Sequence, residues 1–223
     1  KFYADSHKLE LIWTVIPGIV IIVLIGFGIF QWTEVMNIDE NEETIVIEVY
    51  AKQFAWQARY AGADNTLGLG NVNFIDESTN PMGVDMSDTA SQDDKQVTEL
   101  HLPKGKKVLF KFRSQDVLHS AYMPHFRAQM NCVPGMVTQF GFTPKYTTEE
   151  MRQQSEVIAK TQGINKIRSE KGEDLYEFDY VLLCNKICGA SHYSMQMKIV
   201  VEEEEDYKKW LAEQPTLAET SKQ

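Results

Sequence analysis

The hydrophobic pattern changes sharply once along the chain. Residues 11–30, LIWTVIPGIVIIVLIGFGIF, contain no charged side chain. A helix of this length rises about 30 Å, which matches the hydrocarbon core of a bilayer. The run is too long for the core of a signal peptide. Lys1 and Lys8 precede it, whereas acidic residues follow from Glu34 onward. We therefore predict a transmembrane anchor and linker over residues 1–40, with the following domain on the outer side of the membrane.

Beyond the anchor, apolar residues alternate with polar ones, as in half-buried strands. In VLFKFR, Val108, Phe110 and Phe112 point to one face, and Lys111 and Arg113 point to the other. Comparable runs occupy residues 44–60, 98–102, 107–112, 138–142, 177–183 and 195–201. Many short strands of this kind are typical of a β-sandwich or β-barrel. We predict a mainly β domain over residues 41–207.

Two segments of this domain do not fit the strand pattern. Residues 61–96 are rich in Gly, Asn, Asp and Ser, and they are predicted to form a long acidic surface excursion. Residues 147–171 carry helix formers, and they are predicted to form a short helical insertion with Thr147 or Thr148 as its N-cap. After the last strand, residues 208–223 are predicted to form a solvated C-terminal helix and tail.

Composition narrows the classes of partner. The chain has 223 residues and a formal net charge of −10. This charge argues against nucleic acid, because phosphate binding requires a basic patch. It is compatible with a basic protein partner, although acidic surfaces commonly serve only solvation. The chain has three cysteines, too few for a disulfide framework.

Two of these cysteines lie in LLCNKICGASHYSM, where Cys184, Cys188, His192 and Met195 follow one another closely. The flanking strand patterns and a glycine favour a loop between two strands. Thiolates, thioether and imidazole are ligands for copper or zinc, and the methionine favours copper. His119, at the end of a predicted strand in SQDVLHS, is a further candidate ligand. A disulfide or a structural zinc site remains an alternative for the two cysteines.

The remaining histidines are weaker candidates for metal binding. His7 precedes the anchor, His101 lies within a strand, and His125 follows a proline in a loop. Each is interpreted as a structural or surface residue.

These residues resemble subunit II of bacterial haem–copper cytochrome c oxidases. The resemblance rests on C-x3-C-G-x2-H-x2-M together with D-V-L-H-S upstream. It extends to ELIWTVIP at 10–17, KQFAWQARY at 52–60, CVPG at 132–135 and KKW at 208–210. It covers most of the chain except residues 61–96 and 147–171. The family has two transmembrane helices, so we expect the first to lie upstream of Lys1.

The resemblance implies a cupredoxin-like Greek-key β-barrel that holds two copper ions in a binuclear CuA centre. The implied ligands are the side chains of His119, Cys184, Cys188, His192 and Met195 and the backbone carbonyl of Lys186. Ile187 and Tyr193 are expected to keep water away from the metal. Such a centre would take electrons from a cytochrome c and pass them to haem in subunit I, where oxygen reduction to water is coupled to proton pumping. Quinol-oxidising relatives lack the cysteines.

The resemblance also implies where this protein works and what it contacts. We expect it in the bacterial inner membrane, with the soluble domain on the periplasmic side. Its expected partners are subunit I, other oxidase subunits, lipid and a cytochrome c or cytochrome c domain. A membrane-tethered copper chaperone is the alternative, although chaperones use simpler and more exposed ligand sets. A third class, soluble reductases with a CuA domain, would not need the anchor.

Three further positions carry expectations from the family. Glu10 matches an acid at the mouth of a proton path into subunit I. Lys186 replaces a glutamate whose side chain helps to bind an interfacial magnesium, so that magnesium ligand is missing here. Phe54 replaces the tryptophan through which electrons enter, with Trp56 close by. We therefore expect a stably bound or tethered cytochrome donor, with the insertion at 147–171 forming part of its contact.

Overall fold

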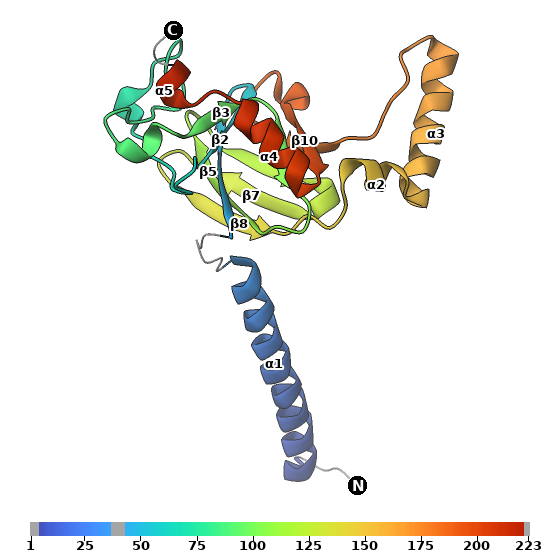
Figure 1. Ribbon diagram of the computed structural model, residues 1–223. Coiled ribbons are helices and arrows are strands. Elements are labelled where there is room, and N and C mark those ends of the chain that lie inside the picture. The colour runs from blue at the N-terminus through green and yellow to red at the C-terminus, as the bar shows by residue number, and fades with distance from the viewer. Residues whose placement is uncertain (1–4, 37–42, 221–223) are drawn as a thin grey trace. The chain divides into compact units, whose positions relative to one another are not determined.

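The structure, a computed structural model, describes residues 5–36 and 43–220 (Figure 1). The chain divides into two compact units, residues 1–38 and residues 39–223. The boundary predicted at residue 40 and the last three residues of the predicted tail lie outside the described residues. The first unit contains α1 (His7–Met36), a helix of 30 residues that includes Pro17.

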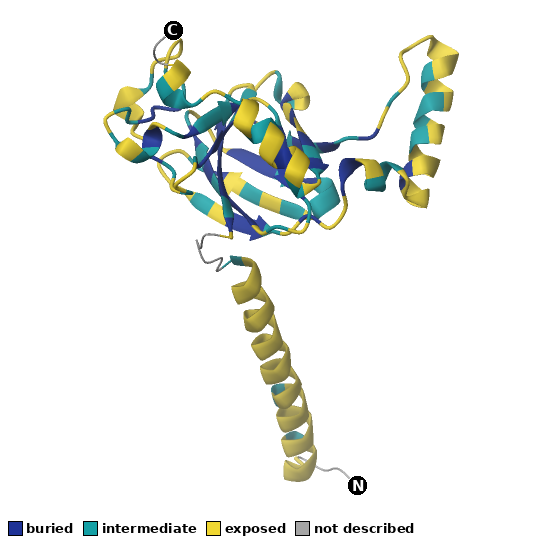
Figure 2. Ribbon diagram, in the orientation of Figure 1, coloured by how far each residue is buried: buried dark blue, intermediate teal, exposed yellow. Residues whose placement is uncertain are grey.

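Helix α1 is the one helix within the described residues that is long and apolar enough to cross a membrane. At 30 residues, it rises about 45 Å. None of its described side chains is buried within the protein (Figure 2). A helix that is apolar on all sides and uncovered by protein is suited to a lipid environment. The predicted membrane core at residues 11–30 lies entirely within it.

The second unit consists of two five-stranded sheets. The first sheet has the order β3 (Lys95–Val97), β2 (Ala55–Tyr60), β1 (Ile45–Lys52), β5 (Val108–Ser114) and β8 (Thr138–Phe142). The second has the order β4 (Leu100–Pro103), β10 (Gln196–Glu202), β9 (Tyr180–Cys184), β6 (His119–Met123) and β7 (Ala128–Cys132). Strands β1 and β5 pair in parallel, as do β10 and β4, whereas the other pairs are antiparallel. The predicted fold class, a mainly β cupredoxin-like domain after an apolar helix, is confirmed.

The core lies between the sheets, as the dark blue strands in Figure 2 show. Val108, Phe110 and Phe112 are completely buried, while Lys111 and Arg113 are half-buried. This is the alternation that the sequence predicts. Phe112 stacks on Phe140 of the neighbouring strand with ring centroids 5.3 Å apart. Burying a phenylalanine side chain contributes roughly 1.5–3 kcal/mol, so this aromatic layer stabilises the first sheet.

Several predicted strand limits differ from the observed ones. The run at 44–60 breaks into β1 and β2 at a turn containing Gln53 and Phe54. His119 begins β6 rather than ending a strand. The chain bends at residues 115–117, just before His119, and there the Asp116 carboxylate accepts hydrogen bonds from the backbone N–H groups of Gln53 and Val117. Strand β7 was not predicted, since its first four residues are exposed or half-buried and carry no clear apolar face.

The excursion at residues 61–96 is not only a surface feature, which corrects the sequence prediction. It contains two short 3-10 helices, η1 (Val72–Phe74) and η2 (Thr89–Ser91), and its last residues begin β3. Met82 and Val84 are buried and pack on Tyr50 of β1. The side chain of Asp94 is also buried. Part of the excursion therefore belongs to the core.

The predicted insertion forms two helices, α2 (Thr148–Arg152) and α3 (Ser155–Lys171). Thr147 is the N-cap of α2 in a capping box with Glu150, which decides between the two predicted caps. We call residues 147–179 the helical arm. Helix α3 stands away from the sheets, and the chain returns beside it toward β9 (Figure 1).

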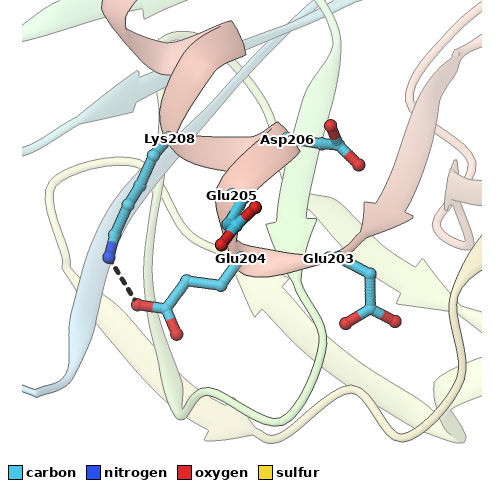
Figure 3. A pocket seen from close by; sticks show the side chains of 5 residues that line it. All are labelled: Glu203, Glu204, Glu205, Asp206 and Lys208. Atoms are coloured by element: carbon cyan, nitrogen blue, oxygen red, sulfur yellow. Dashed lines mark ion pairs between the residues drawn. The ribbon is translucent and has the colours of Figure 1, made fainter.

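The C-terminal helix begins earlier than predicted. Helix α4 (Glu204–Glu213) is followed by α5 (Leu217–Thr220). Tyr207 is buried, and Trp210 stacks on His101 of β4 with centroids 3.9 Å apart, so α4 packs on the domain rather than forming a solvated tail. Its first turn is acidic, and Lys208 pairs with Glu204 at 2.7 Å (Figure 3). Carboxylates at a helix N-terminus are stabilised by the helix dipole.

Candidate metal centre

The candidate ligands lie at neighbouring strand ends of the second sheet. Cys184 is the last residue of β9, and Met195 directly precedes β10. The backbone N–H of Cys184 donates to the carbonyl of Met195 at 3.0 Å and closes the loop between these strands. Strand β6 pairs with β9 opposite Cys184, which brings His119 to the same end of the sheet. Sheet register therefore positions residues that are 65 positions apart.

The donor atoms of the predicted ligands form a continuous cluster. The Cys184 and Cys188 sulfurs are 3.8 Å apart. The Cys184 sulfur lies 3.8 Å from Nδ1 of His119. The Cys188 sulfur lies 3.7 Å from Nδ1 of His192 and 3.8 Å from the Met195 sulfur. The structure thus brings together all five side chains that were predicted to be metal ligands.

The backbone carbonyl of Lys186 completes this cluster. It lies 3.2 Å from the Cys184 sulfur, whereas the Lys186 side chain belongs to an exposed part of the loop. The carbonyl therefore faces the thiols while the ammonium group faces solvent. The backbone can therefore offer this carbonyl whichever side chain stands at position 186.

The cluster is largely shielded from solvent. His119 is completely buried, Met195 is 2% exposed, and Cys184 and Cys188 are 8% and 5% exposed. His192 is half-buried. The two cysteine sulfurs are too far apart for a disulfide bond of about 2.05 Å. Burial and the nearby Cys184 raise the pKa of Cys188 to about 11, so a bound cation must displace protons from the thiols.

This donor set fits copper. It contains two thiols, two imidazoles, one thioether and one carbonyl, and soft sulfur ligands select copper, zinc or iron–sulfur clusters. Methionine sulfur is typical of copper electron-transfer sites and not of structural zinc sites. His119, Cys184 and Cys188 alone place their ligand atoms within 4.8 Å of one another.

Asp116 orients His119. The carboxylate of Asp116 lies 2.9 Å from Nε2 of His119, which leaves Nδ1 turned toward Cys184. Burial acts to raise the pKa of Asp116, but hydrogen bonds from His119, Gln53 and Val117 lower it below its ordinary value. An ionised carboxylate therefore fixes the ring, as is common for metal-bound histidines. Asp116 was not predicted to be a site residue, although it stands three residues before His119 in SQDVLHS.

The turn between β1 and β2 covers one side of the loop. Gln53 donates a side-chain hydrogen bond to the Cys188 carbonyl. The Phe54 ring is 37% exposed and approaches Gly189, which directly follows Cys188. Phe54 therefore lies at the surface beside the cluster. Gln53 is a second functional candidate that was not predicted, although it directly precedes Phe54 in the sequence.

Trp56 has a different environment from Phe54. It is 4% exposed, and its ring meets that of His119 edge to face with centroids 6.2 Å apart. Its indole N–H points to the carbonyl of Met195 at 3.4 Å. Trp56 is thus an inner wall of the cluster, and a docking protein cannot touch it directly.

Within this chain, Ile187 and Tyr193 do not shield the cluster. Their side chains are 87% and 89% exposed. The loop that carries them projects outward because its ligand residues turn inward. Shielding comes instead from buried groups such as Trp56 and Met195.

The remaining sequence candidates lie elsewhere. Glu10 is in the first turn of α1, 3.4 Å from His7. His101 lies between Glu202 and Glu99 and stacks on Trp210. His125 packs edge to face on Phe178. The placements of His101 and His125 agree with their interpretation as structural residues.

An apolar helix followed by a cupredoxin-like domain with this donor cluster defines a class of membrane-anchored metal-binding protein. Comparison with known proteins gives the family. The family described as "Cytochrome C oxidase subunit II, periplasmic domain" matches residues 45–169. The chain belongs to this family of oxidase subunits. The match ends before the cysteine loop, so the site geometry is independent of it.

Individual relatives agree with this assignment. The chain is 34% identical over 216 residues to "Alternative cytochrome c oxidase subunit 2" of Bradyrhizobium diazoefficiens, covering 96% of this chain and 66% of the relative. It is 26% identical to "Cytochrome c oxidase subunit 2" of Alkalihalophilus pseudofirmus, covering 92% of this chain and 44% of the relative. The chain thus spans less than two thirds of the length of each of these relatives.

A structural comparison gives a weaker likeness. The periplasmic domain of subunit II of cytochrome oxidase from Bradyrhizobium japonicum has a TM-score of 0.45 and 16% identity, covering 78% of this chain and 95% of that chain. The family assignment rests on the sequence matches. An apolar helix joined to a periplasmic domain of this family fits a membrane-anchored bacterial protein.

Proposed function

We propose that this protein is the electron-accepting subunit of a terminal respiratory oxidase. The observation that carries the proposal is the convergence of five side chains and one backbone carbonyl in a nearly buried cluster. In the proposed activity, electrons from a cytochrome c reach haem in subunit I, where oxygen is reduced to water with coupled proton pumping. The chain would perform the first transfer only.

The proposed cofactor is a pair of copper ions, which supplies a one-electron carrier when bound. Cys184 and Cys188 would hold the pair as thiolates. The remaining ligands would be His119, His192, Met195 and the carbonyl of Lys186. The buried ligands and Trp56 would exclude water, and Asp116 would hold the His119 ring. A rigid, dry site suits rapid electron transfer because little has to move when the charge changes.

The surface beside the cluster supports contact with other proteins. Phe54, Ile187 and Tyr193 are exposed around the loop. Val117, Leu118, Met136 and Val137 are further exposed apolar residues, from the segments that precede β6 and β8. Grouped exposed apolar side chains are typical of interaction sites. We assign this surface to contacts with the cytochrome donor and with subunit I.

A copper chaperone is less consistent with the same geometry. Delivery of copper requires ligands that a receiving protein can reach. Both cysteines are less than a tenth exposed, and His119 is inaccessible. The oxidase function is therefore preferred.

Substitution of a proposed cysteine ligand tests the copper assignment. Cys184→Ser should abolish the mixed-valence signal of the two-copper protein in electron paramagnetic resonance, because serine cannot supply a thiolate sulfur. Cys132→Ala is the control, since Cys132 is also buried but belongs to β7 and is not one of the proposed ligands. An unchanged signal in the Cys184 variant would exclude the proposed site.

The donor is proposed to be a stably bound or tethered cytochrome c, in a supercomplex or on a fused domain. Phe54 replaces the usual tryptophan, and a donor held at high effective concentration needs a less specialised contact. The helical arm provides additional exposed surface for a fixed interface. The isolated oxidase should oxidise soluble cytochrome c slowly, whereas the intact complex should turn over without added cytochrome. Fast, salt-sensitive oxidation of the soluble protein would contradict this proposal.

The anchor is proposed to place Glu10 at the cytoplasmic mouth of a proton path into subunit I, with the protein in the inner membrane and its second unit in the periplasm. A carboxylate next to a membrane-spanning segment is costly unless it is hydrated or functional. Glu10→Gln should slow oxygen reduction by the assembled oxidase. Turnover equal to that of the wild type would contradict this role.

Lys186 is proposed to eliminate the magnesium ligand found in the family. Its ammonium group is positive and would repel a divalent cation. Metal analysis of the purified oxidase should find no magnesium next to Lys186. Stoichiometric magnesium there would show that the site is retained by other groups.

A further inference from the structure

Gln53 connects the first sheet to the cysteine loop of the second. Its side-chain amide donates to the Cys188 carbonyl. Its backbone N–H donates to one oxygen of Asp116 at 2.8 Å. The other oxygen of Asp116 lies 2.9 Å from Nε2 of His119. One residue therefore reaches two candidate ligands that come from different segments of the chain.

The approach of this turn to the loop is close. Gly189 has a φ of +145°, and a Cβ added there would lie 2.8 Å from the Gln53 amide nitrogen and from two carbons of the Phe54 ring. Only glycine fits this position without displacement. The turn between β1 and β2 is therefore closely packed against the cysteine loop.

Cys188 needs support from outside its own loop. Residues 185–187 and 189–190 are exposed, so the segment around Cys188 has little burial of its own. The two ends of the loop are joined by the Cys184 N–H, which donates to the Met195 carbonyl. The first end is also held by the Asn185 N–H, which donates to the Ser120 carbonyl. Cys188 lies between these ends, and Gln53 binds its carbonyl from the opposite sheet.

We propose that Gln53 is a positioning residue that holds Cys188 and His119 at their copper-binding separation. This inference rests on the proposed function, because it concerns the same cluster. The amide fixes the backbone of Cys188 directly, and the backbone N–H fixes His119 through Asp116. Residues in such supporting positions commonly change metal affinity by about 10–100-fold.

The test uses the full chain in detergent with Gln53→Met, which keeps the side-chain length but removes the amide donor and retains the backbone N–H. Copper affinity should fall about 10–100-fold, and the hyperfine pattern of the two-copper signal should change because Cys188 moves. Gln53→Glu, of the same shape but without the N–H donor, should have the same effects. Gln139→Met is the matched control, since Gln139 is an exposed glutamine of β8 in the same sheet. It should change neither readout.

A readout on the metal-free protein separates this inference from the proposed function. Alkylation of Cys188 should be at least several-fold faster in both Gln53 variants, because the loop opens more often. Cys132, which is completely buried in β7, is the internal reference and should react at an unchanged rate. Variants with wild-type copper affinity, signal and Cys188 reactivity would overturn the role of Gln53. Failure of the wild type to bind two coppers would instead overturn the proposed function.

Discussion

The excursion at residues 61–96 and the helical arm at residues 147–179 both interrupt the strands with polar sequence, but they relate differently to the core. Buried side chains join the excursion to β1 and β2. The arm is attached at its base, where Thr148 of α2 accepts a hydrogen bond from the backbone N–H of Val201 in β10, but in α3 only Val157 is buried. The excursion is part of the folded domain, whereas α3 stands away from the sheets (Figure 2).

Buried charges fix the excursion. Arg59 of β2 binds Asp94 at 2.8 Å, Glu48 of β1 at 2.8 Å and the Gly68 carbonyl at 2.9 Å. Arg113 pairs with the other oxygen of Glu48 at 2.8 Å. Arg59 and Asp94 are at most 2% exposed. A buried guanidinium needs such a set of acceptors, so the network specifies where the excursion lies.

The arm is held mainly by contacts with its own returning segment. Asn165 of α3 exchanges two hydrogen bonds with the backbone of Tyr176, at 2.7 and 3.0 Å. Arg152 binds the Phe178 carbonyl at 2.8 Å and Asp179 at 3.0 Å. These bonds hold the returning segment beside α3, although Val157 is the one buried residue of that helix. Polar composition alone therefore does not distinguish a segment that packs on the core from one that projects away from it.

The largest expected effect follows from removing the centre of the buried network. Arg59→Met should destabilise the protein by about 3–5 kcal/mol, because it leaves buried carboxylates without their partner. The matched control is Lys52→Met, which breaks the surface pair with Glu77 and should cost about 1 kcal/mol or less. Chemical denaturation of both variants in detergent measures the difference. Equal losses in the free energy of unfolding would show that the buried ion pairs of Arg59 stabilise the protein no more than a surface ion pair does.

The same network predicts a pH dependence. Burial raises the pKa of Asp94 to about 6, against the opposing effect of Arg59. The folded protein therefore binds this proton more tightly than the unfolded chain, whose ordinary value is 3.8. The stabilisation is complete below the unfolded value and is lost as pH rises through the folded one. Between pH 4 and 7, the free energy of unfolding of the wild type should fall by up to about 3 kcal/mol relative to Asp94→Asn. A pH-independent difference would show that Asp94 stays ionised.

Much of the site could be predicted from sequence because its ligands are chemically distinctive. Two cysteines, a histidine and a methionine at short spacing are seldom coincidental, and His119 was also a candidate from its motif. Sheet register then accounts for how His119 reaches the cysteine loop. The supporting residues were less visible. Asp116 and Gln53 are ordinary polar residues whose importance depends on contacts between sheets. The exposure of Ile187 and Tyr193 depends on which residues of the loop turn inward.

The fold, like the site, has features that the sequence predicts and features that it does not. The alternation in β5 predicts its buried face directly. The buried part of the excursion was not predictable, since Asp94 is acidic and becomes buried only because Arg59 lies on the adjacent strand. Strand β7 also carries no internal signal, because its pairing with β6 is set by the neighbouring strand.

A smaller, local effect is expected in the arm. Asn165→Ala removes both hydrogen bonds to Tyr176, each of which contributes about 1 kcal/mol. The backbone amides of the returning segment should exchange with solvent faster, while those of β5 and β9 should be unaffected. Hydrogen exchange measured by mass spectrometry resolves these segments. Faster exchange in the sheets would show that the arm and the sheets unfold together.

The smallest expected effect concerns the outer surface of α3. Ile167 is 55% exposed, whereas Met82 of the excursion is completely buried. Ile167→Ala should therefore change the free energy of unfolding by less than about 0.5 kcal/mol. Met82→Ala should cost about 2–5 kcal/mol, because it leaves a cavity against Tyr50. Denaturation curves of the two variants measure how much one large apolar side chain contributes to stability in the arm and in the excursion. A loss at Ile167 as large as the loss at Met82 would mean that the arm packs against the domain in solution, and the comparison would fail.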